Sequence, residues 1–124
     1  MKKIHYNKLI RDRIPDKIRK SGGISRIRKL KKKEYERELL TKVGEEASAL
    51  PKLTKKSELT SELADIIDVI EEIKKFKKIA TSDIKRAQAV NLRKKGGFHK
   101  RLFLYWTSDT GYKTNERRYS KRRK

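Results

Sequence analysis

Residues 57–78 read SELTSELADIIDVIEEIKKFKK, and this stretch decides the fold. Its apolar side chains recur at helical spacing: Leu63, Ile66, Ile67, Ile70 and Ile73. Side chains at these intervals line one face of an α-helix, while the polar residues between them take the opposite face. We predict a long amphipathic helix over 57–78, with Ser57 as its N-cap.

Three further helices are predicted, over 15–20, 33–50 and 81–95. Pro15 suits the first turn of the first helix, and the Ser-Gly-Gly of 21–23 stops it. Pro51 ends the second helix. The helix over 81–95 begins at the polar Thr-Ser-Asp of 81–83 and ends at Gly96. The predicted fold class is all-α, with the second helix and the 57–78 helix packed as an antiparallel hairpin.

The remaining residues form short extended segments at the edges and a tail. Residues 24–30 alternate imperfectly between apolar and basic, which favours a short extended segment. Residues 98–106 are rich in aromatic side chains, which favours a strand or an extended arm whose rings close the core rather than stack on bases. Residues 107–124 are polar and basic without periodicity, so we expect a disordered tail. The predicted division is a helical domain over 1–106 and a basic tail over 107–124.

The composition limits the size of the core and the available chemistry. The chain has 124 residues, of which 43% are charged and 34% hydrophobic. A core this small is marginal for a monomer, so we expect a homodimer. Cys is absent, which excludes disulfides, thiolate zinc sites and Cys nucleophiles. No apolar run is long enough for a membrane span or a signal peptide, and we expect a cytoplasmic protein without a membrane partner.

Charge is distributed unevenly along the chain. The formal net charge is +21, from 37 Lys and Arg against 16 Asp and Glu, yet residues 35–72 carry ten acidic and five basic side chains. Concentrated carboxylates repel phosphate, so a purely electrostatic nucleic-acid binder gains nothing from them. Hard divalent cations, by contrast, take oxygen ligands. The acidic segment therefore favours a cation site, and the basic flanks favour an anionic partner such as a nucleotide or nucleic acid.

The helical period predicts which carboxylates meet. Glu62 and Asp65 are three residues apart and are neighbours on one helix face, and Glu46 lies at the border of the apolar face of 33–50. If the two helices pack through their apolar faces, these three carboxylates converge at the rim, with Asp68 one step further along. Converging carboxylates repel one another unless a cation such as Mg²⁺ lies between them. The same spacing also fits ordinary solvated helix faces.

Four motifs along the chain resemble one family. They read YNKLIRDRIP at 6–15, KVGEEA at 42–47, ELADIIDVI at 62–70 and KGGFHKRLFL at 95–104. In this order they resemble the MazG-like all-α nucleoside triphosphate pyrophosphatases, and among these the phosphoribosyl-ATP pyrophosphohydrolase-like branch. The resemblance spans residues 5–105. It implies a helical core that dimerises into a bundle, binds Mg²⁺ and cleaves a nucleotide between its α- and β-phosphates.

The resemblance also implies roles for individual residues. Glu46, Glu62 and Asp65 would hold the metal, with Asp68 as a further candidate ligand, and Mn²⁺ can take the place of Mg²⁺. Glu45 would orient the attacking water. The phosphates would be bound by basic side chains: Lys8, Arg11, Lys94 and Lys95.

Two departures from the family pattern bear on activity. The family's first acidic motif is Glu-Glu-x-x-Glu, but here Ala49 stands at the last position and cannot bind a cation. The metal can take a water instead, at reduced affinity and activity. The second departure is the basic extension after Trp106. Both leave an alternative open, in which a degenerate pyrophosphatase scaffold serves as a nucleic-acid- or ribosome-associated protein, with nonspecific nucleic-acid contacts through its basic tail.

Overall fold

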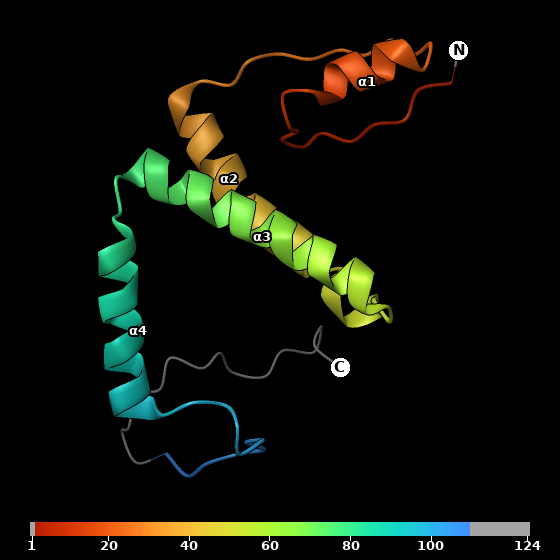
Figure 1. Cartoon of the computed structure of the whole chain (residues 1–124). Coiled ribbons are helices and arrows are strands. Elements are labelled where there is room, and N and C mark those ends of the chain that lie inside the picture. Colours follow the sequence, from red (N-terminus) through yellow and green to blue (C-terminus); the bar gives the residue numbers. More distant parts are fainter. Residues whose placement is uncertain (1, 110–124) are drawn as a thin grey trace. The chain divides into compact units, whose positions relative to one another are not determined.

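The protein is all-helical over the part of the chain that its structure describes. The structure is a computed structural model, and it describes residues 2–109. Figure 1 shows its helices: α1 (Ile14–Lys20), α2 (Lys32–Ala47), the 3-10 helix η1 (Leu50–Lys52), α3 (Lys56–Lys77) and α4 (Thr81–Lys95). No strand occurs within residues 2–109, which confirms the all-α class and excludes the strand considered for 98–106. In the same range no helix has the length and apolar character of a bilayer span.

The backbone divides into two units between Gln88 and Ala89, within α4, and each unit is described by itself. The candidate metal site lies entirely in the first unit. The boundary expected at residue 106 stays a prediction. The tail expected over 107–124 lies outside the described residues from position 110 onward.

A pair of glycines ends α1. Gly22 adopts a left-handed conformation with φ of 82°, which a residue with a Cβ takes up only with strain. In this conformation the N–H of Gly22 donates to the carbonyl of Arg19 (2.9 Å), and the N–H of Gly23 donates to the carbonyl of Ile18 (3.0 Å). The two bonds form a Schellman motif, which satisfies carbonyls that lack partners at the helix end. The predicted stop at 21–23 is confirmed.

Helices α2 and α3 pack against each other and hold the core (Figure 1). Leu39 of α2 is a deeply buried hydrophobic residue, with 3% of its surface exposed. The ring of Tyr35 meets the ring of Phe76 edge to face, with centroids 5.2 Å apart. Beside them, Lys77 Nζ lies 2.8 Å from Glu36 Oε1. These contacts pair the start of α2 with the end of α3.

The end predicted for α2 is wrong by three residues. The helix stops at Ala47 rather than at residue 50, and η1 follows it. The hydroxyl of Ser48 donates to the carbonyl of Glu45 (2.7 Å), which competes with the helical hydrogen-bond pattern. Pro51 has no N–H to donate to the carbonyl of Ala47, so the α-helical hydrogen-bond pattern cannot continue through it. The turn that connects α2 to α3 therefore begins earlier than the apolar spacing indicates.

Helix α3 matches its predicted range within one residue, but its predicted N-cap is wrong. Ser57 lies inside the helix, and the N-cap is Lys55, whose side chain makes no capping hydrogen bond. The apolar face of α3 is only partly covered, because Leu63 is 44% exposed, Ile67 56% and Ile70 38%. A chain with this composition builds a small core, as predicted.

The aromatic segment after α4 does not pack into a core. Phe98 is 95% exposed, Phe103 77% and Trp106 82%. Phe103 and Tyr105 contact each other, with ring centroids 5.0 Å apart. The prediction that these rings close the core is therefore wrong. The backbone over 98–106 forms neither a helix nor a strand. Its aromatic side chains are therefore not aligned on one face that could pack against an apolar surface.

Candidate metal centre

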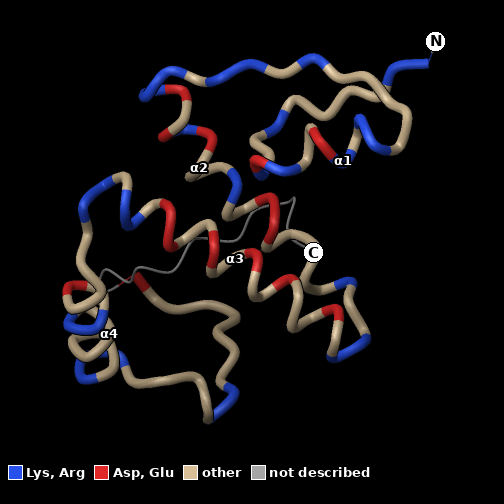
Figure 2. The backbone as a smooth tube through the Cα atoms, turned by 45° about the horizontal axis from the view of Figure 1, so that its top comes forward, with Lys and Arg blue, Asp and Glu red and all other residues tan. Residues whose placement is uncertain are grey.

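Three carboxylates from two helices converge where α2 and α3 pack together. Glu46 lies in the last turn of α2, and Glu62 and Asp65 lie one turn apart on α3. One oxygen from each side chain lies within 4.8 Å of the oxygens from the other two, and all three residues are half-buried. Figure 2 shows Asp and Glu recurring along both helices. The predicted convergence of these three residues is confirmed, while their binding of a metal stays a prediction.

Glu46 and Asp65 disfavour the charged form of Glu62. A hydrogen bond with Glu46 raises the pKa of Glu62 above its ordinary value, and desolvation and the charges of Glu46 and Asp65 act in the same direction. Two neighbouring carboxyl groups form that bond only when a proton lies between them. A divalent cation can replace this proton and neutralise more of the charge.

Lys42 neutralises part of the acidic charge on α2. Its Nζ lies 3.3 Å from Glu46 Oε1 and 3.1 Å from Glu45 Oε1, and its side chain is only 15% exposed. Lys42 was not predicted as part of the site. Its position three and four residues before the two glutamates is nevertheless the spacing of helical ion pairs, which is a signal visible in the sequence.

Glu45 is held as an ion by two lysines rather than pointing freely into solvent. Lys8 Nζ, from the segment before α1, lies 3.2 Å from Glu45 Oε1, the oxygen that also accepts from Lys42. Burial raises the pKa of Glu45, but the hydrogen bonds from Lys42 and Lys8 outweigh this effect, and the pKa lies below its ordinary value. The structure thus brings two predicted site residues, Lys8 and Glu45, into direct contact.

Arg11 contacts α3 next to the three carboxylates. Its Nη2 donates to Asp65 Oδ1 at 3.0 Å and to Asp68 Oδ2 at 2.8 Å. The hydrogen bond to Asp68 is the main reason why the pKa of Arg11 is raised above its ordinary value. Asp68, predicted as a further metal ligand, lies outside the group of three and shares the guanidinium of Arg11 with Asp65, so its metal role stays a prediction.

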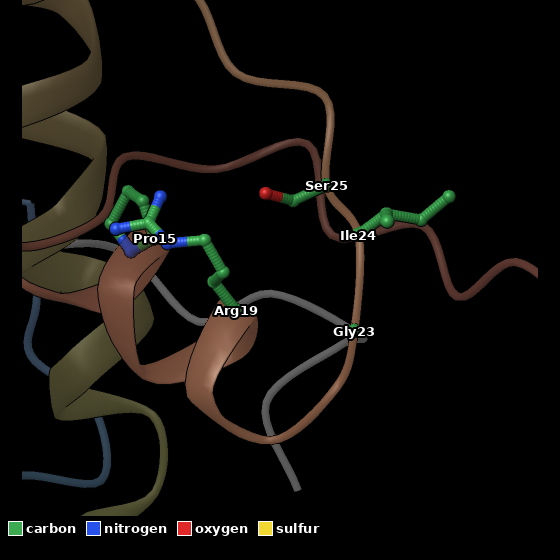
Figure 3. Close-up of a pocket in the computed structure, with 5 residues that line it drawn as sticks. All are labelled: Pro15, Arg19, Gly23, Ile24 and Ser25. Carbon is green, nitrogen blue, oxygen red and sulfur yellow. The ribbon is translucent and has the colours of Figure 1, made fainter.

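Lys94 and Lys95 lie in the last turn of α4 and are exposed. They belong to the second unit, so their predicted role toward phosphate stays a prediction. A separate shallow pocket of about 240 Å³ lies beside α1 (Figure 3). Its lining contains none of the predicted site residues: Pro15, Arg19, Gly23, Ile24 and Ser25.

The donor set of the three-carboxylate group suits a hard divalent cation. Mg²⁺ binds oxygen at about 2.0–2.1 Å, so ligands of one ion lie within about 4 Å of one another, and small side-chain rotations close the remaining gap. Ala49 follows the end of α2 with backbone angles that are still helical (φ −78°, ψ −22°). Position 49 therefore stays one turn from Glu46, but it supplies no oxygen.

Comparisons with protein-family models, with curated proteins and with solved structures found no match to this chain. The interpretation of the site consequently rests on its own geometry and on the four motifs. The geometry contributes a three-carboxylate group. The class of reaction that the motifs imply stays a prediction.

Proposed function

We propose that this chain is a Mg²⁺-dependent nucleotide pyrophosphohydrolase, which cleaves a nucleoside triphosphate or a related nucleotide between its α- and β-phosphates. The convergence of Glu46, Glu62 and Asp65 from two helices is the observation that supports this most strongly. In the proposed fold, α2 and α3 form an antiparallel hairpin, and a second copy completes a bundle. The exposed apolar side of α3 supports such a homodimer, because burial of apolar surface drives association.

Each part of the site has a task in this reaction. Glu46, Glu62 and Asp65 would hold the cation, which when bound neutralises phosphate charge and polarises the scissile bond. Glu45 is kept ionised by Lys8 and Lys42, so it accepts a hydrogen bond from water and orients it toward the phosphoanhydride. Water adds across the α–β bridge, and a nucleoside triphosphate yields a monophosphate and pyrophosphate.

Basic side chains around the carboxylates would bind the phosphate oxygens. Lys8 and Arg11 lie on the segment that reaches α2 and α3, and both belong to the first motif. Guanidinium and ammonium groups form short, charge-assisted hydrogen bonds to phosphate. Lys94 and Lys95 are proposed for the same task. The missing carboxylate at Ala49 leaves one more coordination position to water, so we propose a weaker metal affinity and Mn²⁺ as an alternative ion.

Pyrophosphate release from a panel of canonical and damaged nucleoside triphosphates, with Mg²⁺ and with Mn²⁺, tests the proposal. Glu62→Gln and Asp65→Asn should each abolish metal-dependent cleavage while circular dichroism shows unchanged helix content. Glu58→Gln is the matched control, because Glu58 lies one turn before Glu62 on α3 and outside the three-carboxylate group. Wild-type rates in both site variants would contradict the proposed site.

A second candidate function is association with nucleic acid. Residues 84–108 contain seven Lys and Arg and no Asp or Glu. The same stretch exposes aromatic rings, with Phe98 95%, Tyr105 86% and Trp106 82% exposed. Aromatic rings on a basic segment can stack on unpaired bases while the cations contact phosphates. The observation that favours this function is the exposure of the rings, which the pyrophosphohydrolase proposal leaves unexplained.

Deletion of residues 112–124 separates the two functions. This segment carries seven Lys and Arg against one Glu. Its removal should weaken binding to single-stranded RNA, and the slope of log K against log salt should fall by about 1 for each lost phosphate contact. Cleavage of nucleotides should persist, since the proposed metal ligands lie between Glu46 and Asp65. Loss of cleavage with retained helix content would show that the deleted segment belongs to the active site.

A further inference from the structure

The segment before α1 is attached to α2 and α3 through its cations. Lys8 Nζ lies 3.2 Å from Glu45 Oε1, and Arg11 Nη2 bridges Asp65 (3.0 Å) and Asp68 (2.8 Å). The apolar side chains of the segment contribute less, because Ile4 is 68% exposed and Tyr6 65%. Leu9 is half-buried. The ion pairs are therefore the specific contacts that place Lys8 beside α2 and Arg11 beside α3.

Asp65 takes part in two arrangements. It is one of the three carboxylates that converge between α2 and α3, and it also accepts a hydrogen bond from Arg11. A carboxylate has lone pairs for both partners, but a guanidinium and a divalent cation on one side chain repel each other at short range. The contact with Asp68 keeps the guanidinium in place on the same helix face.

We propose that Arg11 is an internal counter-ion, which competes with the divalent cation at Asp65 and is displaced when the cation binds. This inference rests on the proposed metal site. In the metal-free protein Arg11 neutralises Asp65 and Asp68 and draws residues 2–13 onto α3. When the cation binds, the charge that attracts Arg11 falls and the guanidinium leaves Asp65. Lys8 still holds the segment at Glu45, so the segment becomes more mobile but stays attached.

The exposure of these pairs makes the exchange easy. The side chain of Arg11 is 60% exposed, that of Asp65 41% and that of Asp68 58%. Exposed ion pairs are individually weak, so a divalent ion with three carboxylate ligands replaces them readily. The planar guanidinium then becomes free for phosphate, which it matches with two parallel hydrogen bonds. Because coupling between ligands is reciprocal, metal binding and phosphate binding would strengthen each other.

Titration of Mn²⁺ by electron paramagnetic resonance into three proteins tests the competition. They are the wild type, Arg11→Gln and the matched control Arg13→Gln. Arg13 carries the same charge two residues later, and within residues 2–109 it makes no ion pair. Loss of two exposed pairs to Asp65 and Asp68 should tighten Mn²⁺ binding by about fivefold in Arg11→Gln. The control should change by less than about twofold, since long-range charge effects are screened by salt.

The outcomes separate the inference from the proposed site. Equal or weaker Mn²⁺ affinity in Arg11→Gln would overturn the competition and leave the metal site standing. Failure of all three proteins to bind Mn²⁺ would overturn both. The gain in mobility of the segment is measured in a second experiment, which does not depend on the fold of the Arg11 variant. The chain has no Cys, so a dye can be placed on His5→Cys alone. Its fluorescence anisotropy should fall on addition of Mg²⁺, and an unchanged value at saturation would overturn the release of Arg11.

Discussion

Replacement of Gly44 by Ala is expected to stabilise the protein. Gly44 lies inside α2, three residues before the helix ends at Ala47, and it is exposed. A Cβ at this position would meet no atom within 4 Å, and the backbone there has no positive φ that would strain Ala. The substitution therefore changes only the intrinsic helix preference, which favours Ala over Gly by about 1 kcal/mol.

This magnitude is measurable. A gain of 1 kcal/mol is a sizeable part of the roughly 5–15 kcal/mol by which folded domains are stable. Urea unfolding followed by circular dichroism should show a higher midpoint with an unchanged slope. Ala64→Gly is the matched reverse control, because Ala64 is an exposed position of α3. It should lower the free energy of unfolding by about the same 1 kcal/mol.

A lower stability of Gly44→Ala would refute this reasoning. It would mean that the open space at Gly44 is filled in solution, for example by a second copy of the chain. Nucleotide cleavage by the same variant gives a further result. If phosphate approaches the backbone beside Glu45 and Glu46, the added methyl group should reduce cleavage while the protein becomes more stable.

Two other predictions concern the carboxylates. Ala49→Glu should tighten Mg²⁺ binding and raise activity, because the helical backbone at position 49 places the new carboxylate one turn from Glu46. Isothermal titration with Mg²⁺ tests this prediction, and an unchanged affinity would contradict it. The hydrogen bonds of Glu34 with Arg28 and the N–H of Lys31 hold its pKa at about 2, below the ordinary 4.5, so its contribution to stability is present above pH 4.5 and is lost as the pH falls toward 2. Glu34→Gln should therefore show a smaller loss of stability between pH 4.5 and 2 than the wild type in urea unfolding, and identical pH profiles would exclude this contribution.

The sequence by itself determined the features that depend on local interactions. The period of apolar residues over 57–78 predicts α3 to within one residue at each end. The glycines at 22 and 96 mark the ends of α1 and α4, where both adopt positive φ. These signals work because helical hydrogen bonds and left-handed caps join residues close together in the chain. The spacing of Glu62 and Asp65 on one face is local in the same sense.

Only the tertiary structure decided which charges meet. The helical period alone allows Asp68 to join the carboxylate group, but the packing of α2 against α3 brings Glu46 to Glu62 and Asp65 instead. Asp68 accepts a hydrogen bond from Arg11, which is 57 residues away in the sequence. Such a pairing depends on the register between two helices and on the path of the chain before α1, and no local rule encodes either. Charges attract every opposite charge nearby, so their partners follow from the packing rather than from their spacing.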